Sequence, residues 1–404
     1  MPEYVGVDYL RRQLEKKRTR VKLRYKYYDM KNQVADFNIT TPPEFKHLKA
    51  VLGWCGKTVD SLADRLCFRE FRDDNFDLNT IYAMNNRDIL FDSAVNSALI
   101  GSCCFIYIVS DADFPIMEVI DGSDATGIID TSTGLLKEGY AVLERDENEN
   151  AVSEAYFLPR ETVFIQGKNT WTVRHESPYP LLVPVIHRPD ASRPFGRSRV
   201  TRACMALMQG ALRTIKRSEV SAEFYSFPQR YVTGLAQDVE FQKLLATISS
   251  FLSFTKDDEG DSPHLGQFSQ QSMAPFTEQL RTFASLFAGE TGLTLDDLGF
   301  ATDNPSSAEA IKASHENLRL AARKAQRTFG SGFLNAGYLA ACVRDNYAYR
   351  RDQLYQTKSV WEPIFEPDAA MLSGIGDGAA KINQAVPGYF GKDNMRDLTG
   401  IDPE

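Results

Sequence analysis

The chain has 404 residues, of which 43% are hydrophobic and 25% charged, so it is long enough for a sizeable core and too apolar for a disordered chain. Its net charge of −8 argues against a generic DNA-binding protein, which usually carries a basic surface. Apolar runs such as CCFIYIV at 103–109 are too short to span a bilayer, and no signal peptide is visible. We therefore expect a soluble protein without a membrane partner.

Cysteine and histidine patterns indicate neither disulfides nor metal. The six cysteines lie in apolar runs without CxxC spacing, which predicts buried free thiols in a reducing compartment. The five histidines are scattered, so no metal site is expected. Neither GxGxxG nor GxxxxGK[ST] occurs, and we expect no cofactor.

The first hundred residues predict three helices. Residues 9–28 form a basic segment, interpreted as a solvated or subunit-packing helix, with a nucleic-acid or membrane helix as the alternative. A second helix is expected in LGWCGKTVDSLADRLCF (52–68), where apolar residues through Phe68 recur at close to helical spacing. A third is expected over 87–102, with Gly101 as its C-terminal cap.

From about 103 to 188 the pattern changes from helical to strand-like. Short β-rich runs are divided by Asp, Asn, Gly and Pro. GIIDTSTG (127–134) and ERDENEN (144–150) are typical of connections between antiparallel strands. The sequence thus predicts a helix-flanked β domain.

Two helices separated by an insertion follow. One is expected from about Ser198 to Tyr225 and is stopped by Pro228. A strand, a helix, the acidic loop KDDEGDSP (256–263) and another strand lead into a second helix, which begins near Ser272. That helix carries an apolar stripe of Phe276, Leu280, Phe283 and Phe287.

The longest helix is expected to begin at NPSSAEAI, after a small polar loop. Ser306 and Glu309 have the spacing of a capping box, and Gly330, Gly332 and Gly337 predict a kink. Arg319, Arg323 and Arg327 repeat every four residues, which suits either a solvated face or a neighbour's carboxylates. The chain ends in a proline-broken stretch and a short helical hairpin.

Asp296 and Asp297, in the loop before this helix, suggest an acid hydrolase. Catalysis by two carboxyl groups requires both to face one substrate with separated pKa values. Adjacent residues usually point apart, and the loop offers no nucleophile. A structural or electrostatic role is therefore the favoured interpretation, and no catalytic residue is expected.

The order of these segments resembles one family, the portal proteins of tailed bacteriophages, in their long-tailed branch. The early helix at 52–68 and the β region ALIGSCCFIYIVSDADFPIMEVIDGSDATGIIDTSTG (98–134) resemble parts of the family's wing. PFGRSRVTRACMALMQGALRTIKRSEVSAEFYSFPQRYVTG (194–234) resembles its descending stem helix entering the clip. GETGLTLDDLGFATDNPSSAEAIKASHENL (289–318) resembles the end of its ascending stem helix, its tunnel loop and its long wing helix.

The resemblance implies an α+β portal-type fold with a helix-flanked β wing, a two-helix stem, a small clip, a long kinked wing helix and a short helical crown. The implied limits are 1–197 for the N-terminal helices and wing, 198–225 and 272–290 for the stem, and 226–271 for the clip. The tunnel loop would span 291–305, the long helix 306–358 and the crown 359–404.

The resemblance also implies a homo-oligomeric ring, typically of twelve subunits, at one capsid vertex of the virion, assembled in the host cytoplasm. Double-stranded DNA would pass through the ring during packaging and ejection. The implied partners are the terminase large subunit, a head-completion or adaptor protein, and the major capsid and scaffolding proteins.

Site residues follow from the same resemblance together with the charge pattern. The candidates that face DNA in the tunnel loop are Thr294, Asp296, Asp297, Thr302, Asp303 and Asn304. Arg213, Lys216 and Arg217 form a candidate basic ring in the channel or pair with the next subunit. Arg319, Arg323 and Arg327 are candidates for subunit contacts, and Asp257, Asp258, Glu259 and Asp261 for docking of the terminase or an adaptor.

Two alternatives remain open at this point. A different capsid or head-tail connector protein would lack the paired stem helices with an insertion between them. A carboxylate-dependent hydrolase would act through Asp296 and Asp297, or a cysteine.

Overall fold

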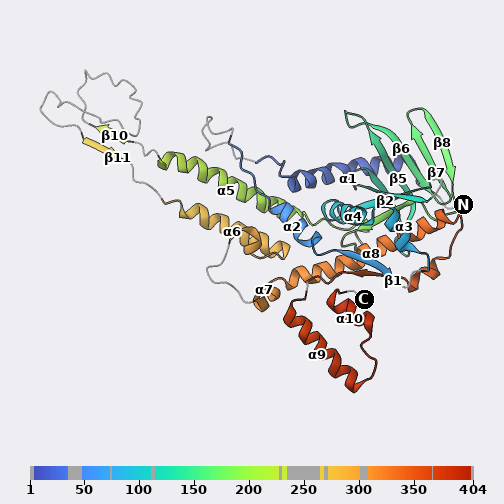
Figure 1. Cartoon of the computed structure of the whole chain (residues 1–404). Helices are drawn as coiled ribbons and strands as arrows, with labels where there is room; N and C mark the ends of the chain where they lie inside the picture. Colours follow the sequence, from blue (N-terminus) through green and yellow to red (C-terminus); the bar gives the residue numbers. More distant parts are fainter. Residues whose placement is uncertain are drawn as a thin grey trace. The chain divides into compact units, whose positions relative to one another are not determined.

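The chain divides into two units in the computed structural model (Figure 1). The first comprises Met1–Asn32, Gly53–Met205 and Ala288–Glu404, and the second Gln33–Leu52 and Ala206–Phe287. The structure describes residues 4–34, 48–72, 75–110, 114–226, 230–233, 264–267, 272–300, 308–365 and 367–401. None of the helices in these ranges has the length and hydropathy of a transmembrane span.

The β-rich region forms two antiparallel sheets. One has the order β4-β5-β6-β7-β8 and consists of Ala125–Ile129, Leu136–Arg145, Ala151–Leu158, Glu161–Gln166 and Asn169–Arg174. The other has the order β3-β2-β9 and consists of Pro115–Ile120, Cys103–Ser110 and Leu182–Ile186. The predicted connections at 127–134 and 144–150 are confirmed, because β4 pairs with β5 and β5 with β6.

The sheets pack face to face because their strands alternate side chains between two faces. Phe157 of β6 meets Tyr107 of β2 with ring centroids 5.3 Å apart. On the other face of the five-stranded sheet lies α1 (Val7–Tyr28), whose Leu10 and Leu14 pack against Tyr140. The basic segment 9–28 is thus an amphipathic helix that buries its apolar face on this sheet.

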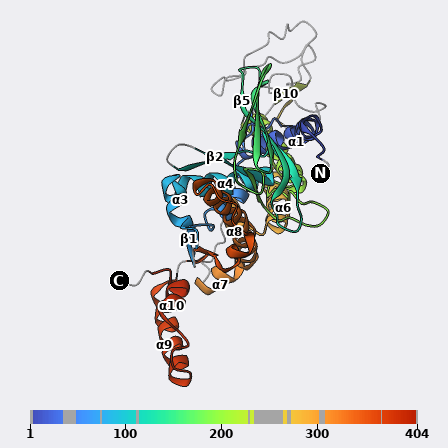
Figure 2. The ribbon, with the colours of Figure 1, turned by 90° about the vertical axis from the view of Figure 1, so that its right-hand side faces the viewer.

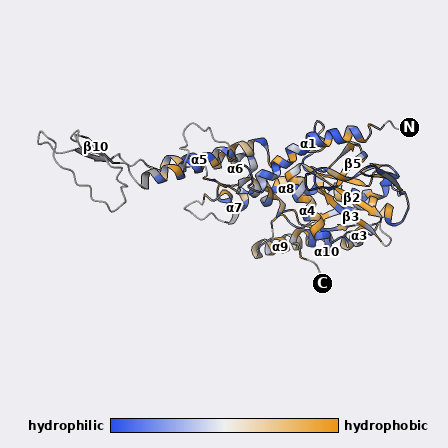
Figure 3. Cartoon of the chain, turned by 90° about the horizontal axis from the view of Figure 1, so that it is seen from above, coloured by the Kyte–Doolittle hydropathy of each residue, from blue (hydrophilic) through white to orange (hydrophobic). Residues whose placement is uncertain are grey.

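The three-stranded sheet is covered by α4 (Arg87–Gly101) and α8 (Glu316–Arg344), which lie side by side in Figures 1 and 2. Phe91 of α4 and Phe333 of α8 pack edge to face at 4.6 Å. Hydrophobic residues gather around β2 (Figure 3), whose side chains from Cys103 to Ile106 are fully buried.

The glycines of α8 allow close packing. α8 is a single helix through Gly330, Gly332 and Gly337. A Cβ at Gly330 would lie 2.2 Å from the Ser359 hydroxyl oxygen, and one at Gly332 would lie 3.3 Å from the Pro184 carbonyl oxygen. The helical region is interrupted at His315, between α7 (Ala308–Ser314) and α8. The predicted kink at the three glycines stays a prediction. The predicted capping box begins at Ser306, which lies outside the described residues.

Three local predictions between residues 52 and 102 are wrong. α2 spans Trp54–Ala63, and Phe68 starts β1 (Phe68–Arg72), which pairs with β12 (Lys358–Trp361). This strand depends on a partner nearly 300 residues away, which local periodicity does not reveal. α4 includes Gly101, and Ser102 after it takes the positive φ of 90°. Among the six free cysteines, Cys67 is exposed while the other five are buried.

The last described elements are helices that follow β12. A 3-10 turn at Arg351–Gln356 precedes β12, and the chain ends in α9 (Ala369–Ala385) and α10 (Lys392–Thr399). Another short helix, α3 (Leu78–Met84), lies between β1 and α4. Asp397 of α10 accepts two hydrogen bonds from Arg72 of β1, at 2.7 and 3.0 Å. Most of α9 is exposed. The predicted C-terminal hairpin of two helices is confirmed.

The second unit is built mainly from two helices. It contains most of α5 (Arg202–Ser226) and α6 (Ala274–Thr291), and the hairpin of β10 (Arg230–Thr233) with β11 (His264–Gln267). A Cβ at Gly210 would lie 2.6 Å from the Phe283 ring, so glycine lets the helices approach closely. The Thr214 hydroxyl donates to the Gln279 side chain at 3.1 Å. The apolar stripe of α6 is confirmed, ending in the buried Phe287.

Candidate functional site

The polar loop begins with an anchored segment. Gly292, with φ +72°, ends α6 and donates its N–H to the Ala288 carbonyl at 2.8 Å, a common helix termination. Leu293 is buried before a 3-10 turn at Asp296–Leu298, and Leu298, the last residue of the turn, is buried as well. Residues 293–300 are therefore held by the first unit.

Asp297 fixes this turn through reciprocal hydrogen bonds with Thr294. Both the N–H and the hydroxyl of Thr294 donate to Asp297 Oδ2 at 2.9 Å, and the Asp297 N–H donates to the Thr294 hydroxyl oxygen at 3.2 Å. His315 Nε2 lies 3.2 Å from the same carboxylate oxygen. Burial would raise the pKa of Asp297, but the Thr294 hydrogen bonds and nearby His315 outweigh it and leave the pKa below its ordinary value.

The neighbouring carboxylate has a different environment. Asp296 is exposed, whereas Asp297 is half-buried and engaged with Thr294 and His315. Asp297 is thus engaged in holding the turn, and only Asp296 projects an exposed carboxylate from it. In the part of the chain that the structure describes, no three His, Cys, Asp or Glu side chains are grouped to hold a metal ion.

Seven predicted site residues lie outside the described ranges: Thr302, Asp303 and Asn304 in the loop, and Asp257, Asp258, Glu259 and Asp261 in the acidic insertion. Their proposed roles remain predictions.

The basic residues of α5 have unequal exposure. Lys216 is only 7% exposed, while Arg213 and Arg217 are half-buried. All three have partners within the chain. The three cations are therefore unequally exposed within one subunit, and their place in a channel ring or at a subunit contact stays a prediction.

The aligned arginines of α8 also differ. Arg319 makes a two-pronged ion pair with Glu316, with both N–O distances 2.7 Å. Arg323 and Arg327 are exposed. Arg327 makes no ion pair with any other residue in the described ranges. It therefore keeps its charge available for a contact outside the chain.

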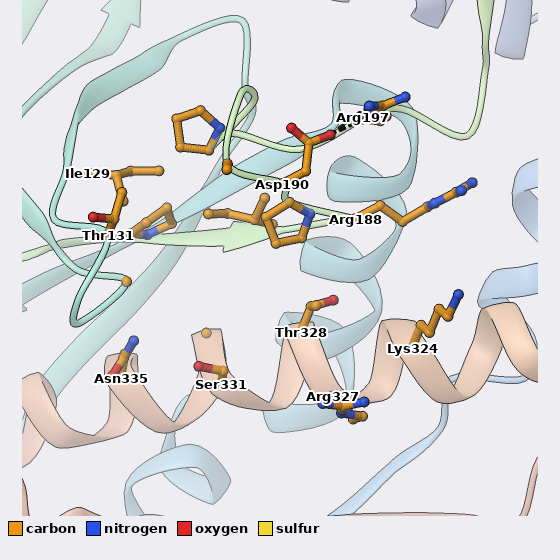
Figure 4. Close-up of a pocket in the computed structure, with 17 residues that line it drawn as sticks. Ile129, Thr131, Arg188, Asp190, Arg197, Lys324, Arg327, Thr328, Ser331 and Asn335 are labelled. Carbon is orange, nitrogen blue, oxygen red and sulfur yellow. Dashed lines mark hydrogen bonds and ion pairs between the residues drawn. The ribbon is translucent and has the colours of Figure 1, made fainter.

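Arg327 lines a groove of about 950 Å³ between α8, the segment 188–197 and the β4–β5 connection (Figure 4). Arg188, Arg197 and Lys324 line it as well. Its one acidic lining residue, Asp190, is paired with Arg197 at 2.6 Å. The groove therefore carries an excess of positive charge.

The segment 188–197 has a tightly specified shape. Gly196 has φ +71°, and a Cβ there would lie 2.1 Å from the His187 carbonyl oxygen. The buried His187 ring contacts the Arg197 carbonyl oxygen through Nδ1 at 2.7 Å, and burial lowers its pKa to about 3. His187 is thus neutral near pH 7, and this wall is a fixed part of the fold.

A buried arginine lies where α5 begins and α6 ends. Arg199 is 8% exposed and donates to the carbonyls of Thr58, at 3.1 Å, and Thr291, at 2.6 Å. Burial lowers its pKa to about 10, so it remains charged near neutral pH. A cation at a helix C-terminus is favourable because it faces carbonyl groups without helical partners. Arg199 thus ties α2 to the residue from which the polar loop departs.

Comparison with known families decides the assignment. The family described as "Phage portal protein, SPP1 Gp6-like" matches residues 7–367. The chain belongs to this portal protein family. The match includes the anchored loop, the groove and Arg199.

Two curated portal proteins are similar over most of their length. Those of Mycobacterium phage L5 and Mycobacterium phage D29 are each 26% identical to the chain over 396 residues, covering 92% of this chain and 80% of each relative. The resemblance to tailed-phage portal proteins seen in the sequence is confirmed.

Solved structures of gene transfer agent particles are also similar. The chain matches a chain of the native virion with TM-score 0.44 and 12% identity, and one of the native neck, computed with C12 symmetry, with TM-score 0.45 and 12% identity. Each match covers 87% of this chain and 90% of the other.

Sequence analysis of this portal protein missed Arg199 and the groove. Arg199 stands in PFGRSRVTR, as one of three arginines that look alike in sequence. The groove is formed by segments more than 130 residues apart, from 188 to 327. One available signal was Gly196, a glycine within a short loop that lies between a strand and a helix.

Proposed function

We propose that the chain assembles into a closed ring, of twelve subunits, at one vertex of a tailed-phage capsid, and that double-stranded DNA passes through the ring during packaging and ejection. The observation that carries this proposal is the portal-family match across residues 7–367. A closed ring needs two different complementary faces on each subunit.

The polar loop is proposed as the part that meets DNA. Its base is held by Gly292, Leu293 and the Thr294–Asp297 hydrogen bonds, while Asp296 is exposed. Ring symmetry would repeat each exposed carboxylate around the bore. A constriction that repels phosphates weakly lets DNA slide, because every neutralised phosphate would add affinity. Thr302, Asp303 and Asn304 would extend this polar surface.

The remaining partners follow from the same proposal. The carboxylates Asp257, Asp258, Glu259 and Asp261 would face the terminase large subunit during packaging and a head-completion protein afterwards. The major capsid and scaffolding proteins would contact the ring's outer surface. DNA movement would be powered by the terminase, with no catalytic residue in this chain.

Negative-stain microscopy of the purified protein tests the ring. Rings with a central channel are expected, counted after class averaging. A protein that stays monomeric at high concentration contradicts the proposal.

The loop is tested separately by deleting residues 301–305, which spares the anchored segment 293–300. We expect rings to form at the wild-type level and packaged DNA, measured as nuclease-protected DNA per particle, to fall. Normal packaging by the deletion variant would refute the loop's proposed role.

A hydrolase remains the second candidate because Asp296 is exposed. It is tested by incubating the pure protein with DNA, ATP or a glycoside. We expect no turnover. Turnover abolished by Asp296→Asn would favour the enzyme.

A further inference from the structure

The groove beside α8 carries charge that its own chain leaves unmatched. Arg188 and Lys324 extend toward one end of it, whereas Ile129 and Thr131 lie at the other end (Figure 4). Arg188, Lys324 and Arg327 make no ion pair with another residue of the described ranges. Pro184 and Ile186 also line the groove. Its chemistry suits an acidic segment with an apolar side chain.

Such a segment lies on α4 of the same chain. Its outer face exposes Asp88, Ile89 and Asp92, and Ile89 is 66% exposed although it is large and apolar. Asp88 makes a solvent-exposed ion pair with the adjacent Arg87 at 3.3 Å. Asp92 makes no ion pair with another described residue. Burial and the nearby charge of Asp88 raise the pKa of Asp92, as expected for an acidic pair without a cation between its members.

Neither surface takes part in the contact between α4 and α8. Phe91 of α4 packs on Phe333 of α8. With 3.6 residues per turn, Ile89 lies about 160° around α4 from Phe91, Asp92 about 100° and Asp88 about 60°, all on one exposed side of the helix. Lys324, Arg327 and Ser331 likewise lie on the side of α8 away from Phe333. The acidic face and the basic groove of one chain therefore cannot meet each other, but they can meet their counterparts on two neighbours.

We propose that the α4 face formed by Asp88, Ile89 and Asp92 docks into the basic groove of an adjacent copy of this chain. The inference rests on the ring of the proposed function and assigns two of its contacting surfaces. The carboxylates would lie by Lys324 and Arg327, and Ile89 would cover the apolar lining. Complementary charges set which surfaces pair and in which register. The contact is heterologous, and its repetition by rotation closes a ring.

Charge reversal tests this pairing. Variant A carries Lys324→Glu and Arg327→Glu, and variant B carries Asp88→Lys and Asp92→Lys. Each alone brings like charges together, so we expect the concentration for half-maximal ring assembly to rise at least about tenfold. An equimolar mixture of A and B restores opposite charges at every contact, provided that the two alternate. We therefore expect the mixture to form rings containing both in equal amounts.

The readouts are mass photometry and negative-stain microscopy, with circular dichroism to show that each variant is folded. Matched controls are Lys168→Glu and Glu147→Lys, exposed residues in the turns of the five-stranded sheet, which should assemble like the wild type. If A and B alone assemble like the wild type, or if folded A and B fail when mixed, the pairing is wrong while the proposed ring stands. If the wild type forms no ring, the proposed function fails.

A second measurement does not depend on charge reversal. In a Cys67→Ser background, Asp92→Cys combined with Arg327→Cys should give a ladder of covalent oligomers with a short bismaleimide. Asp92→Cys combined with Lys168→Cys should not. Absence of the ladder in assembled rings, or an equal ladder in the control, overturns the inference.

Discussion

Arg199 and Arg327 lie in two regions of the molecule that differ in the burial and the partners of the guanidinium group. Arg199 is buried where α5 begins and donates to two backbone carbonyls. Arg327 lies in an open groove with no anionic partner among the described residues. The Arg199 guanidinium makes its hydrogen bonds within the subunit, whereas the Arg327 guanidinium is accessible to an anionic group of another molecule.

The difference teaches how charge serves folding and assembly separately. A buried polar group costs free energy unless its hydrogen bonds are made, so its removal is felt within one chain. An exposed charge contributes little to the stability of that chain. We therefore expect replacement of the buried Arg199 to lower monomer stability, and replacement of the exposed charges in the groove to leave it nearly unchanged.

Replacement of Arg199 by methionine should have the largest effect. It leaves the buried carbonyls of Thr58 and Thr291 without their donor, at a cost of about 2–4 kcal/mol in the free energy of unfolding. Denaturant titration of the monomeric form measures it, with Arg323→Met as the exposed control. Equal free energies of unfolding for the two variants would show that the buried Arg199 stabilises the monomer no more than an exposed arginine does.

Gly196→Ala should come next, because it strains a wall of the groove from inside the fold. The new Cβ would lie 2.1 Å from the His187 carbonyl oxygen on a residue with φ +71°. We expect a loss of about 2–3 kcal/mol in the free energy of unfolding. Gly167→Ala is the matched control, since Gly167 has φ +60° but no atom within 4 Å of the added Cβ. It should lose only about 1 kcal/mol.

Asp297→Asn should have a smaller, pH-dependent effect. The folded-state pKa of Asp297 lies below its unfolded value of about 3.9, so the unfolded state binds more protons between the two values. The stabilisation is present above about pH 4 and is lost as pH falls through the folded pKa. The wild type should exceed the variant by about 1–2 kcal/mol at pH 6.

Denaturant titrations of both proteins between pH 6 and pH 3 measure this difference. The gap should narrow as the pH falls. A stability difference that widens toward low pH would show that the pKa of Asp297 is raised by folding rather than lowered.

Arg327→Ala should have the smallest effect on the monomer, within about 0.5 kcal/mol in the free energy of unfolding, because its side chain is exposed. Thermal unfolding under monomeric conditions measures it. A loss comparable to that of Arg199→Met would mean that the groove is an internal structural feature.

Local patterns predicted much of this fold because their partners are close in sequence. The turns at 127–134 and 144–150 join neighbouring strands, and the stripe ending at Phe287 follows one helix. Phe68 was misplaced because its strand is defined by β12, far along the chain. The glycines of α8 also give room to Ser359 and Pro184, which the sequence did not indicate because both residues are distant along the chain.

The candidate site was predictable in part. The sequence singled out Asp296 and Asp297 as a pair. It did not show that Thr294 and His315 contact only Asp297. The contact with His315 depends on the end of the short helix α7, which the sequence did not predict as a separate helix. Likewise the repeat of Arg319, Arg323 and Arg327 was visible, while the Glu316 pair that neutralises Arg319 depends on side-chain conformation.

The pairing of β1 with β12 marks a boundary in mechanical strength near the C-terminus. Up to Trp361 the chain is held by a backbone ladder and by ring contacts with Phe68. Beyond it, α10 is joined to β1 by ion pairs of Arg72 with Asp397 and of Arg396 with Glu70, and α9 buries only Ala379. Under a pulling force applied to the C-terminus, α9 and α10 would detach first, and the pairing of β12 with β1 would resist further unfolding.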